Sequence, residues 1–274
     1  MTHSIPNKST DIVIQNLTLR YQNKLLFDQF NMVLPEGKWT VLLGASGIGK
    51  STLLKSIAGL PTGVENKMTS KNIFASDGDP ITGRISYMAQ QDLLMPWLTV
   101  LENCLLGYRM RGQAIGLEQL NQATDLLRQA GLKGLETSKI QILSGGMRQR
   151  VSLIRTLLDQ KPFVLMDEPF SALDSITRLN IQDLAVKWLR AKTVLMVTHD
   201  PLEALRISDR IYILLGQPAQ LLEYRMPESA LPRQLADTQL LKAQAELLNL
   251  LSSNSGSARK FPGVDPEFWP SRNC

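Results

Sequence analysis

The sequence predicts an α/β fold built on a mainly parallel sheet. Three short apolar runs, at residues 39–43, 163–166 and 193–197, end at glycine or at polar or acidic residues, and helix-like segments follow them. Short apolar strands that alternate with helices are typical of a parallel sheet that is covered on both faces. The alternation therefore indicates one buried sheet with helices on its two sides.

Size and composition are those of an ordinary globular protein. The chain has 274 residues, of which 43% are hydrophobic and 20% are charged, so it can bury a real core, which argues against disorder and fibrous repeats. The net charge of +5 is spread without a dense block of lysine and arginine. Because a nucleic-acid partner usually requires such a cluster, we expect no nucleic acid as partner.

We expect a cytoplasmic protein that neither spans a membrane nor is exported. No window approaches about 18 consecutive apolar residues. Residues 1–10 lack the basic start and the apolar stretch of a signal peptide. Cys104 and Cys274 show none of the close spacings of a zinc site or a redox pair, so we expect reduced thiols and assign them no function.

The first elements are predicted to be two antiparallel strands. Apolar and polar residues alternate from Val13 to Tyr21, which indicates a half-exposed strand over residues 11–21, and residues 25–34 resemble it. The buried run at 39–43 then stops at a glycine-rich loop, and a helical pattern closed by Gly59 follows.

A mostly helical insertion is expected in the middle of the chain. Residues 97–135 lack apolar runs and contain a helical pattern over 117–132, for which Gly131 would serve as C-cap. The leucines at helical spacing are residues 117, 120, 126 and 127.

The last elements are a strand, a helix and a tail. The run at 211–215 is predicted to be a strand, and residues 239–251 have the pattern of an amphipathic helix. The Ser/Gly/Pro-containing segment 252–274 is expected to be mobile.

One loop matches the phosphate-binding pattern G-x-x-x-x-G-K-[ST] directly between a strand and a helix, the context that confirms this motif. Its residues are Gly44, Ala45, Ser46, Gly47, Ile48, Gly49, Lys50 and Ser51. Glycines let the backbone wrap a phosphate, Lys50 reaches its oxygens, and Ser51 offers a hydroxyl to Mg²⁺. The alternative is a glycine-rich turn beside a surface lysine.

A second apolar strand ends in Asp167 and Glu168. In phosphate-loop enzymes the first such carboxylate holds Mg²⁺, and a second can polarise the attacking water. Taken alone, two acidic residues at a strand end are weak support, since such residues also solvate strand ends. The phosphate loop makes the functional interpretation the favoured one.

Leu143-Ser-Gly-Gly146 opens a helix about twenty residues before Asp167, and its backbone N–H groups would form a second anion-binding helix start. A phosphate loop, LSGG and Asp-Glu, in that order, resemble the ATP-binding cassette (ABC) ATPases. The resemblance covers roughly residues 11–225. It implies a phosphate-loop NTPase core, an antiparallel β subdomain and an inserted helical subdomain.

Four further positions match family motifs. Tyr21 sits where the family stacks an aromatic residue on adenine, although a lone Tyr at a strand end is otherwise more often structural. Gln90 matches the glutamine that contacts Mg²⁺ and the attacking water, and its spacing to Pro96-Trp97 favours it over the adjacent Gln91.

The other two matches follow the acidic strand end. Asp174, in Ser171-Ala-Leu-Asp174, matches the loop that crosses the dimer interface. His199 falls after a strand and matches the histidine that contacts the γ-phosphate, whereas the alternative is a capping or buried imidazole.

The resemblance implies a head-to-tail homodimer that binds two ATP molecules. Each ATP would lie between Lys50, Ser51 and Thr52 of one cassette and Ser144, Gly145 and Gly146 of the other. Glu168 would be the general base, Ser51, Gln90 and Asp167 would hold Mg²⁺, and His199 would stabilise charge on the γ-phosphoryl group.

The expected organisation is an ATPase domain over residues 1–225, with its helical subdomain at about 91–145, and a C-terminal helix and tail over residues 226–274. Residues 61–84 match the family only loosely, at the place of a short antiparallel turn and a glycine-marked loop.

A single cassette resembles the ATPase subunit of a bacterial importer, at the cytoplasmic face of the cell membrane with separate permease and solute-binding proteins. The segment Leu94-Met-Pro-Trp97 would form the groove for the permease, although Pro-Trp can instead simply pack the subdomain. Several motifs resemble the nitrate/sulfonate/taurine group, and residues 174–178 and 198–205 lean toward thiamine-precursor members. The alternative is a non-transport ABC ATPase that acts on ribosomes or DNA.

Overall fold

The computed structural model describes residues 10–22, 24–62, 72–224 and 229–253. Its centre is a six-stranded sheet with the strand order β5-β6-β7-β3-β8-β9, in which only the β8–β9 pair is antiparallel. The strands are β3 (Trp39–Gly44), β5 (Ile85–Met88), β6 (Phe163–Asp167), β7 (Thr193–Thr198), β8 (Arg210–Leu215) and β9 (Gln220–Tyr224). The predicted mainly parallel sheet is confirmed.

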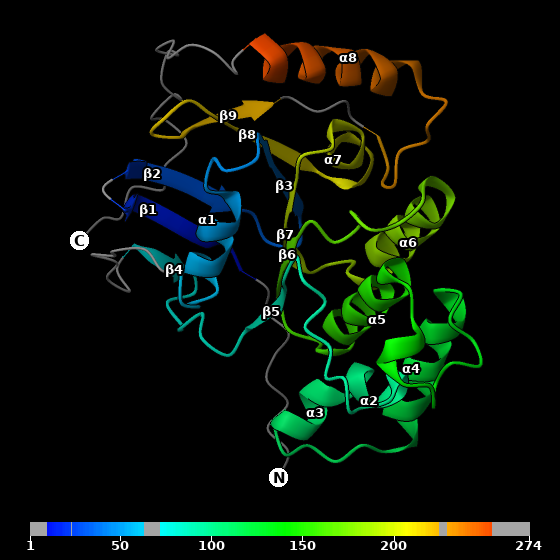
Figure 1. Cartoon of the computed structure of the whole chain (residues 1–274). Coiled ribbons are helices and arrows are strands. Elements are labelled where there is room, and N and C mark those ends of the chain that lie inside the picture. Colours follow the sequence, from blue (N-terminus) through cyan, green and yellow to red (C-terminus); the bar gives the residue numbers. More distant parts are fainter. Residues whose placement is uncertain (1–9, 23, 63–71, 225–228, 254–274) are drawn as a thin grey trace.

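A second, antiparallel sheet stands beside the first (Figure 1). It has the order β2-β1-β4, formed by β1 (Ile12–Tyr21), β2 (Lys24–Leu34) and β4 (Ile73–Ala75). The two strands predicted at the start of the chain are therefore present and paired. β4 lies in the loosely matching stretch 61–84, of which residues 63–71 lie outside the described part.

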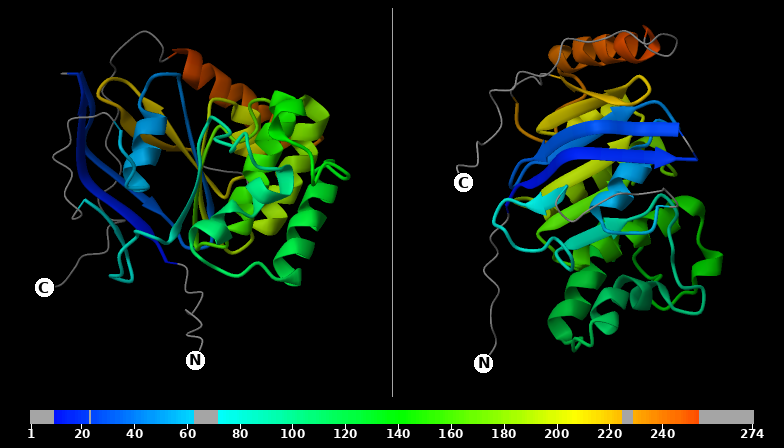
Figure 2. Two further views of the ribbon diagram at one scale, coloured as in Figure 1. Left: turned by 60° about the horizontal axis from the view of Figure 1, so that its bottom comes forward. Right: turned by 90° about the vertical axis from the view of Figure 1, so that its left-hand side faces the viewer.

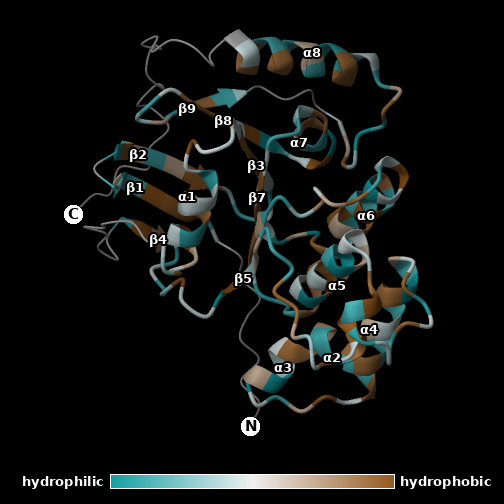
Figure 3. Ribbon diagram, in the orientation of Figure 1, coloured by the Kyte–Doolittle hydropathy of each residue, from teal (hydrophilic) through white to brown (hydrophobic). Residues whose placement is uncertain are grey.

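Successive side chains of the central strands point to opposite faces of the sheet, and each face has its own hydrophobic core. In β3, Val41 and Leu43 belong to one hydrophobic cluster and Leu42 to the other. The face of the central sheet that carries Leu42 packs against α1 (Lys50–Ile57) and the antiparallel sheet. The central strands are accordingly hydrophobic along most of their length (Figure 3).

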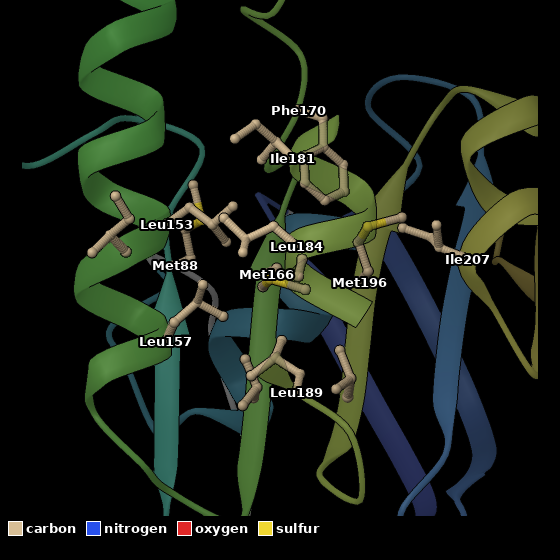
Figure 4. Packing of buried hydrophobic residues seen from close by; sticks show 14 of the residues in the cluster. Met88, Leu153, Leu157, Met166, Phe170, Ile181, Leu184, Leu189, Met196 and Ile207 are labelled. Atoms are coloured by element: carbon tan, nitrogen blue, oxygen red, sulfur yellow. The ribbon is translucent and has the colours of Figure 1, made fainter. Parts of the chain in front are cut away.

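The opposite face of the sheet is covered by helices α5 (Gly145–Leu158), α6 (Ser175–Trp188) and α7 (Pro201–Ile207). Figure 4 shows Leu153 and Leu157 beside Met88 and Met166 of the central strands. These two leucines lie one helical turn apart, so this stripe of α5 seats the helix on the sheet.

The insertion between β5 and β6 is helical, as predicted. It contains α2 (Val100–Cys104), α3 (Leu106–Met110), α4 (Leu117–Gln129) and the short helix η1 (Ile140–Ile142), and α2 and α4 pack against α5. The C-cap of α4 is Ala130, so the predicted C-cap Gly131 lies one residue further on, where it adopts a φ of 70° and the Leu132 N–H donates to the Leu127 carbonyl.

The C-terminal helix α8 (Thr238–Ser253) corresponds to the predicted amphipathic helix and packs on α7. Its buried residues Leu240, Ala243 and Leu247 belong to the same cluster as α5 to α7. Figures 1 and 2 place α8 at the opposite end of the molecule from α2 to α4. The expected mobile tail lies outside the described residues from 254 onward, and the division of the chain at residue 225 stays a prediction.

Candidate functional site

The phosphate loop follows a fully buried strand and opens a helix. All six residues of β3 are buried, and α1 begins at Lys50. Gly47 and Gly49 have φ values of 79° and 108°, and a Cβ at Gly49 would lie 3.1 Å from the Phe27 ring. Only glycine fits there without strain. The N-terminus of α1 thus faces the loop, as an anion site requires.

Lys50 lies against the loop that it follows. Its Nζ donates to the carbonyl oxygens of Gly44 and Ala45 at 2.8 and 2.9 Å, and the residue is 6% exposed. Burial lowers the pKa of Lys50, while the charges of Glu168 and Asp167 oppose that shift. A phosphate anion in the loop would give this buried ammonium a close counter-charge.

Asp167 ends β6 beside the start of α1. The Ser51 hydroxyl donates to Asp167 Oδ1 at 3.0 Å. Asp167 is 2% exposed, and burial raises its pKa, whereas the Ser51 hydrogen bond lowers it. These two oxygen donors fit Mg²⁺, which usually takes one or two protein carboxylates and completes its shell with water and substrate phosphate.

Glu168 occupies a strained backbone position where three elements converge. Its φ is 48°, in the left-handed region, and its N–H donates to the Val197 carbonyl at 2.9 Å. Its Oε1 lies 3.0 Å from His199 Nδ1, and its Oε2 accepts from Gln90 Nε2 at 3.4 Å. The Glu168 side chain is only 16% exposed, whereas that of His199 is 58% exposed.

The parallel register explains this convergence. β5, β6 and β7 are neighbours, with Met88 beside Met166 and Asp167 beside Val197. The carboxyl ends of the three strands therefore lie at one edge, where parallel sheets commonly bind ligands. Gln90, Glu168 and His199 each follow such an end within two residues.

A pocket of about 320 Å³ joins Gln90 and Glu168 with the phosphate loop, and His199 reaches it only through its contact with Glu168. Its lining includes Gln90 and Glu168 but not Gln91, and the choice of Gln90 over Gln91 as the magnesium contact stays a prediction. The remaining lining residues are Tyr21, Leu26, Ser46, Gly47, Gly49, Lys50, Ser51 and Thr52. Tyr21, 42% exposed at the end of β1, offers an aromatic ring at this pocket.

The LSGG segment and Asp174 lie outside this pocket. Ser144 caps α5 and accepts from the Met147 N–H at 3.3 Å, so Gly145 and Gly146 form the first turn. Asp174 caps α6 and accepts from the Thr177 N–H at 3.0 Å. The predicted site residues therefore form two groups within one chain. One group lies at the phosphate pocket, and the other, formed by the LSGG turn and Asp174, lies outside it.

Sequence reasoning missed Gln149. Its side chain is buried on α5, where its Nε2 donates to the Glu168 carbonyl at 3.1 Å and its Oε1 accepts from the Ala172 N–H at 2.8 Å. Gln149 shares helical spacing with Ser152 and Leu153, which are also buried. A polar residue on the inward stripe of a helix was the signal that could have revealed it.

A polar cluster behind His199 was missed as well. The Thr198 hydroxyl donates to Glu203 Oε2 at 2.8 Å, and Arg178 Nε lies 3.5 Å from Glu203 Oε1. Burial raises the pKa of Glu203 to about 7. Asp200 caps α7 by accepting from the N–H groups of Leu202 and Glu203. The cluster fixes the backbone on both sides of His199.

Among the residues that the structure describes, no three His, Cys, Asp or Glu side chains gather as a metal-binding group. Within the same part of the chain, none of the helices is both long and apolar enough to cross a bilayer.

The chain is similar in sequence to known ATP-binding proteins of transporters. The model of the ABC transporter family matches residues 27–171. The chain is 40% identical over 233 residues to an aliphatic sulfonates import ATP-binding protein of Rhodococcus jostii, covering 84% of this chain and 89% of the relative. It is 39% identical over 200 residues to a taurine import ATP-binding protein of Burkholderia pseudomallei, covering 71% of this chain and 74% of the relative.

A solved dimeric ATP-binding cassette in a post-hydrolysis state, bound to ADP and Pi, superposes with a TM-score of 0.65 at 30% identity. The match covers 80% of this chain and all of that one. A second dimeric structure of that same cassette matches with a TM-score of 0.62 at 32% identity, covering 74% of this chain and 93% of the other.

Proposed function

Because the chain belongs to the ABC transporter family and is one of its ATPases, we propose that it powers a bacterial importer of a small solute by ATP-driven closure of a cassette dimer. The observation that carries this proposal is one pocket at the carboxyl ends of the parallel strands. It joins a phosphate loop to a carboxylate that both a histidine and a glutamine hold.

The pocket and the side chains bonded to its lining offer the groups that ATP hydrolysis needs. The backbone of residues 44–49 and the Lys50 ammonium would bind the phosphates, and Tyr21 would stack on the adenine ring. Glu168 would accept a proton from the attacking water as general base. His199, the more exposed partner of Glu168, would then stabilise charge that develops on the γ-phosphoryl group.

Ser51, Asp167 and Gln90 would hold Mg²⁺ beside the phosphates. The support is the Ser51–Asp167 hydrogen bond and the place of Ser51 and Gln90 in the same pocket. When bound, this ion would neutralise charge on the β- and γ-oxygens.

The functional unit would be a head-to-tail homodimer. Within one chain, Ser144, Gly145, Gly146 and Asp174 stay apart from the phosphate pocket, so a second copy would bring its own LSGG turn onto the bound ATP. The dimeric cassettes of similar fold support this arrangement. Closure would then require ATP in both sites, and hydrolysis would release it.

The receiver of this motion would be a membrane permease that works with a solute-binding protein. Trp97 is 68% exposed and Leu93 is 53% exposed, both shortly after Gln90. Large exposed apolar side chains near a moving nucleotide contact fit a docking surface for a short permease helix. The ATPase would thus lie at the cytoplasmic face of the cell membrane.

The solute would be a sulfonate or taurine, since two similar proteins bear those names. A pyrimidine precursor of thiamine is the second candidate, on the strength of residues 174–178 and 198–205. Action on ribosomes or DNA is the less favoured alternative, because the similar proteins named for a function are import subunits.

The Glu168→Gln variant tests the catalytic assignment. The amide cannot accept the proton of the attacking water, so turnover should fall by about 10²–10⁴-fold while ATP binding persists. Steady-state phosphate release and equilibrium binding of a fluorescent ATP analogue measure the two effects. Near wild-type turnover would remove Glu168 from the role of base.

Transport is tested with the complete assembly. The chain would be reconstituted in vesicles with a candidate permease and solute-binding protein, and uptake of radiolabelled taurine, an alkanesulfonate and a hydroxymethylpyrimidine would be compared. Uptake of one of them that depends on ATP and on Glu168 supports the proposal. Co-purification with ribosomes or DNA, without permease stimulation, would contradict it.

A further inference from the structure

The Gln149 side chain joins two parts of the molecule that have different tasks. It projects from the helix that begins with the LSGG turn and contacts the segment that follows Glu168. Its Nε2 donates to the Glu168 carbonyl at 3.1 Å and to Ser171 Oγ at 3.2 Å, and its Oε1 accepts from the Ala172 N–H at 2.8 Å. Both polar atoms of the amide are therefore used, in a residue that is 6% exposed.

These contacts hold a backbone position that is unfavourable by itself. A left-handed glutamate, as at Glu168 with its φ of 48°, persists only where its surroundings determine it. Here the N–H of Glu168 is bound by the Val197 carbonyl, and its own carbonyl accepts from Gln149 and from Ser171. Of these anchors, only Gln149 comes from the LSGG helix.

A second contact joins the same two parts. A Cβ at Gly146 would lie 2.9 Å from the Ala172 carbonyl oxygen, so the first turn of α5 lies directly against this loop. The glycine contact and the Gln149 amide are on adjacent turns of α5 and reach the same residue, Ala172. The LSGG turn and residues 168–172 therefore behave as one body.

We propose that Gln149 is a positioning residue that holds Glu168 in its reactive place and links the two ATP sites of the dimer. This inference rests on the proposed function, in which the LSGG turn of one cassette contacts the ATP bound by its partner. Glu168 of that same cassette acts on the ATP that this cassette binds in its own phosphate loop. Gln149 thereby links the contact of the LSGG turn with the partner's ATP to the general base at the cassette's own ATP.

The Gln149→Met variant tests this link, because methionine has a similar shape but makes none of the three hydrogen bonds. Measured on the full chain, kcat should fall about 10²-fold, the scale for a misplaced reacting group. The ATP concentration at half-maximal rate should stay within about twofold, and positive cooperativity in ATP should be lost. A purely structural role would instead lower thermal stability without separating kcat from ATP affinity.

Gln182→Met is the matched control. Gln182 is 1% exposed, and its Oε1 accepts from Arg206 Nη1 at 2.9 Å, far in sequence from both ATP-contacting turns. This control should unfold at a temperature similar to that of Gln149→Met yet keep wild-type kcat and cooperativity. Equal kcat in the two variants would overturn the inference.

A second variant covers the case in which Gln149→Met folds poorly. Gln149→Glu keeps the acceptor for the Ala172 N–H but removes the donor to the Glu168 carbonyl, so its kcat should also fall while ATP affinity persists. Wild-type kcat in this variant would overturn the inference. Failure of the proposed function is distinct, because a wild-type chain that does not act as an ATP-driven cassette dimer would itself show neither cooperativity in ATP nor an ATP-dependent dimer.

Discussion

A buried glutamate with a raised pKa, Glu203, lies just behind the site. Glu203 is 5% exposed, and the charged or titratable groups that face it are Arg178, Asp200 and His199. Burial raises its pKa to about 7 from an ordinary value of 4.5, and the Thr198 hydrogen bond and the Arg178 charge only partly oppose this. A neutral Glu203 is therefore favoured in the folded chain.

This shift predicts a pH dependence of stability. Because the folded state binds the Glu203 proton more tightly, the contribution is complete below the unfolded pKa and is lost as pH rises through about 7. The free energy of unfolding of the wild type should therefore fall more between about pH 5 and pH 8 than that of Glu203→Gln. Urea denaturation at both pH values measures the difference.

Glu118→Gln, which changes an exposed glutamate on α4, serves as the control and should follow the wild-type profile. Parallel profiles for all three proteins would show that Glu203 does not carry the effect.

At this scale the sequence predicted the residues whose roles depend on local spacing. Lys50 and Ser51 belong to one short motif, and the structure places them at the pocket. Gln149 was missed because its partners are backbone atoms about twenty residues away. No spacing rule encodes a hydrogen bond to a distant carbonyl.

Among the elements, the loop over residues 94–99 receives three hydrogen bonds from one buried amide, that of Asn103. Asn103 is fully buried, its Oδ1 accepts from the Met95 N–H at 2.8 Å, and its Nδ2 donates to the carbonyls of Met95 and Thr99 at 3.1 and 2.9 Å. This amide therefore fixes both ends of the loop.

Asn103→Ala should lower the free energy of unfolding by about 1–3 kcal/mol, because buried backbone groups lose their partners. Denaturant titration measures this change. Lys133→Ala, at an exposed position of the same insertion, should leave stability within about 0.5 kcal/mol. A neutral Asn103→Ala would show that water replaces the amide.

Trp97 lies at the tip of this anchored loop. Its carbonyl accepts from Lys139 Nζ at 2.8 Å, and that of Pro96 accepts from Gln141 Nε2 at 2.8 Å, while the indole remains mostly exposed. Trp97→Ala should therefore leave basal ATP hydrolysis and thermal stability unchanged. It should weaken permease binding about tenfold or more, the scale for a hot-spot tryptophan.

Leu248→Ala is a suitable control for Trp97, since Leu248 is 50% exposed on α8, a helix at the opposite end of the molecule from α2 to α4 (Figure 2). Equal permease affinity in both variants, measured by pull-down with the detergent-solubilised partner, would place the docking surface elsewhere.

Element prediction succeeded where burial was complete. β3, β6 and β7 are buried along their whole length and were visible as apolar runs. β9 was missed because it is an edge strand of intermediate and exposed residues, stabilised mainly by its ladder with β8. β4 has only three residues, too few for an alternation to be recognised.

For the whole molecule, the separation of the LSGG turn from the phosphate pocket predicts assembly that depends on ATP. In the Glu168→Gln background the chain should form a dimer with Mg²⁺ and ATP and remain a monomer without nucleotide. Light scattering coupled to size-exclusion chromatography measures the mass.

Adding Ser144→Arg should abolish this dimer. The bulky arginine side chain would fill the space in which the LSGG turn contacts the phosphates of the ATP bound by the partner. Lys133→Arg in the same background is the control and should preserve dimerisation. A dimer that forms equally without ATP would contradict a site shared between two chains.

The strand order of the central sheet has a further consequence, for synthesis on the ribosome. β3, which leads into the phosphate loop, pairs with β7 and β8, and neither of its neighbours lies within the first half of the chain. At about 5–20 residues per second, the roughly 150 residues between β3 and β7 take on the order of ten seconds to emerge. During that interval an apolar strand lacks both partners, so the nascent chain is a natural client for chaperones. ATP cannot stabilise β3 in its sheet until β7 and β8, which lie in the last third of the chain, have been translated.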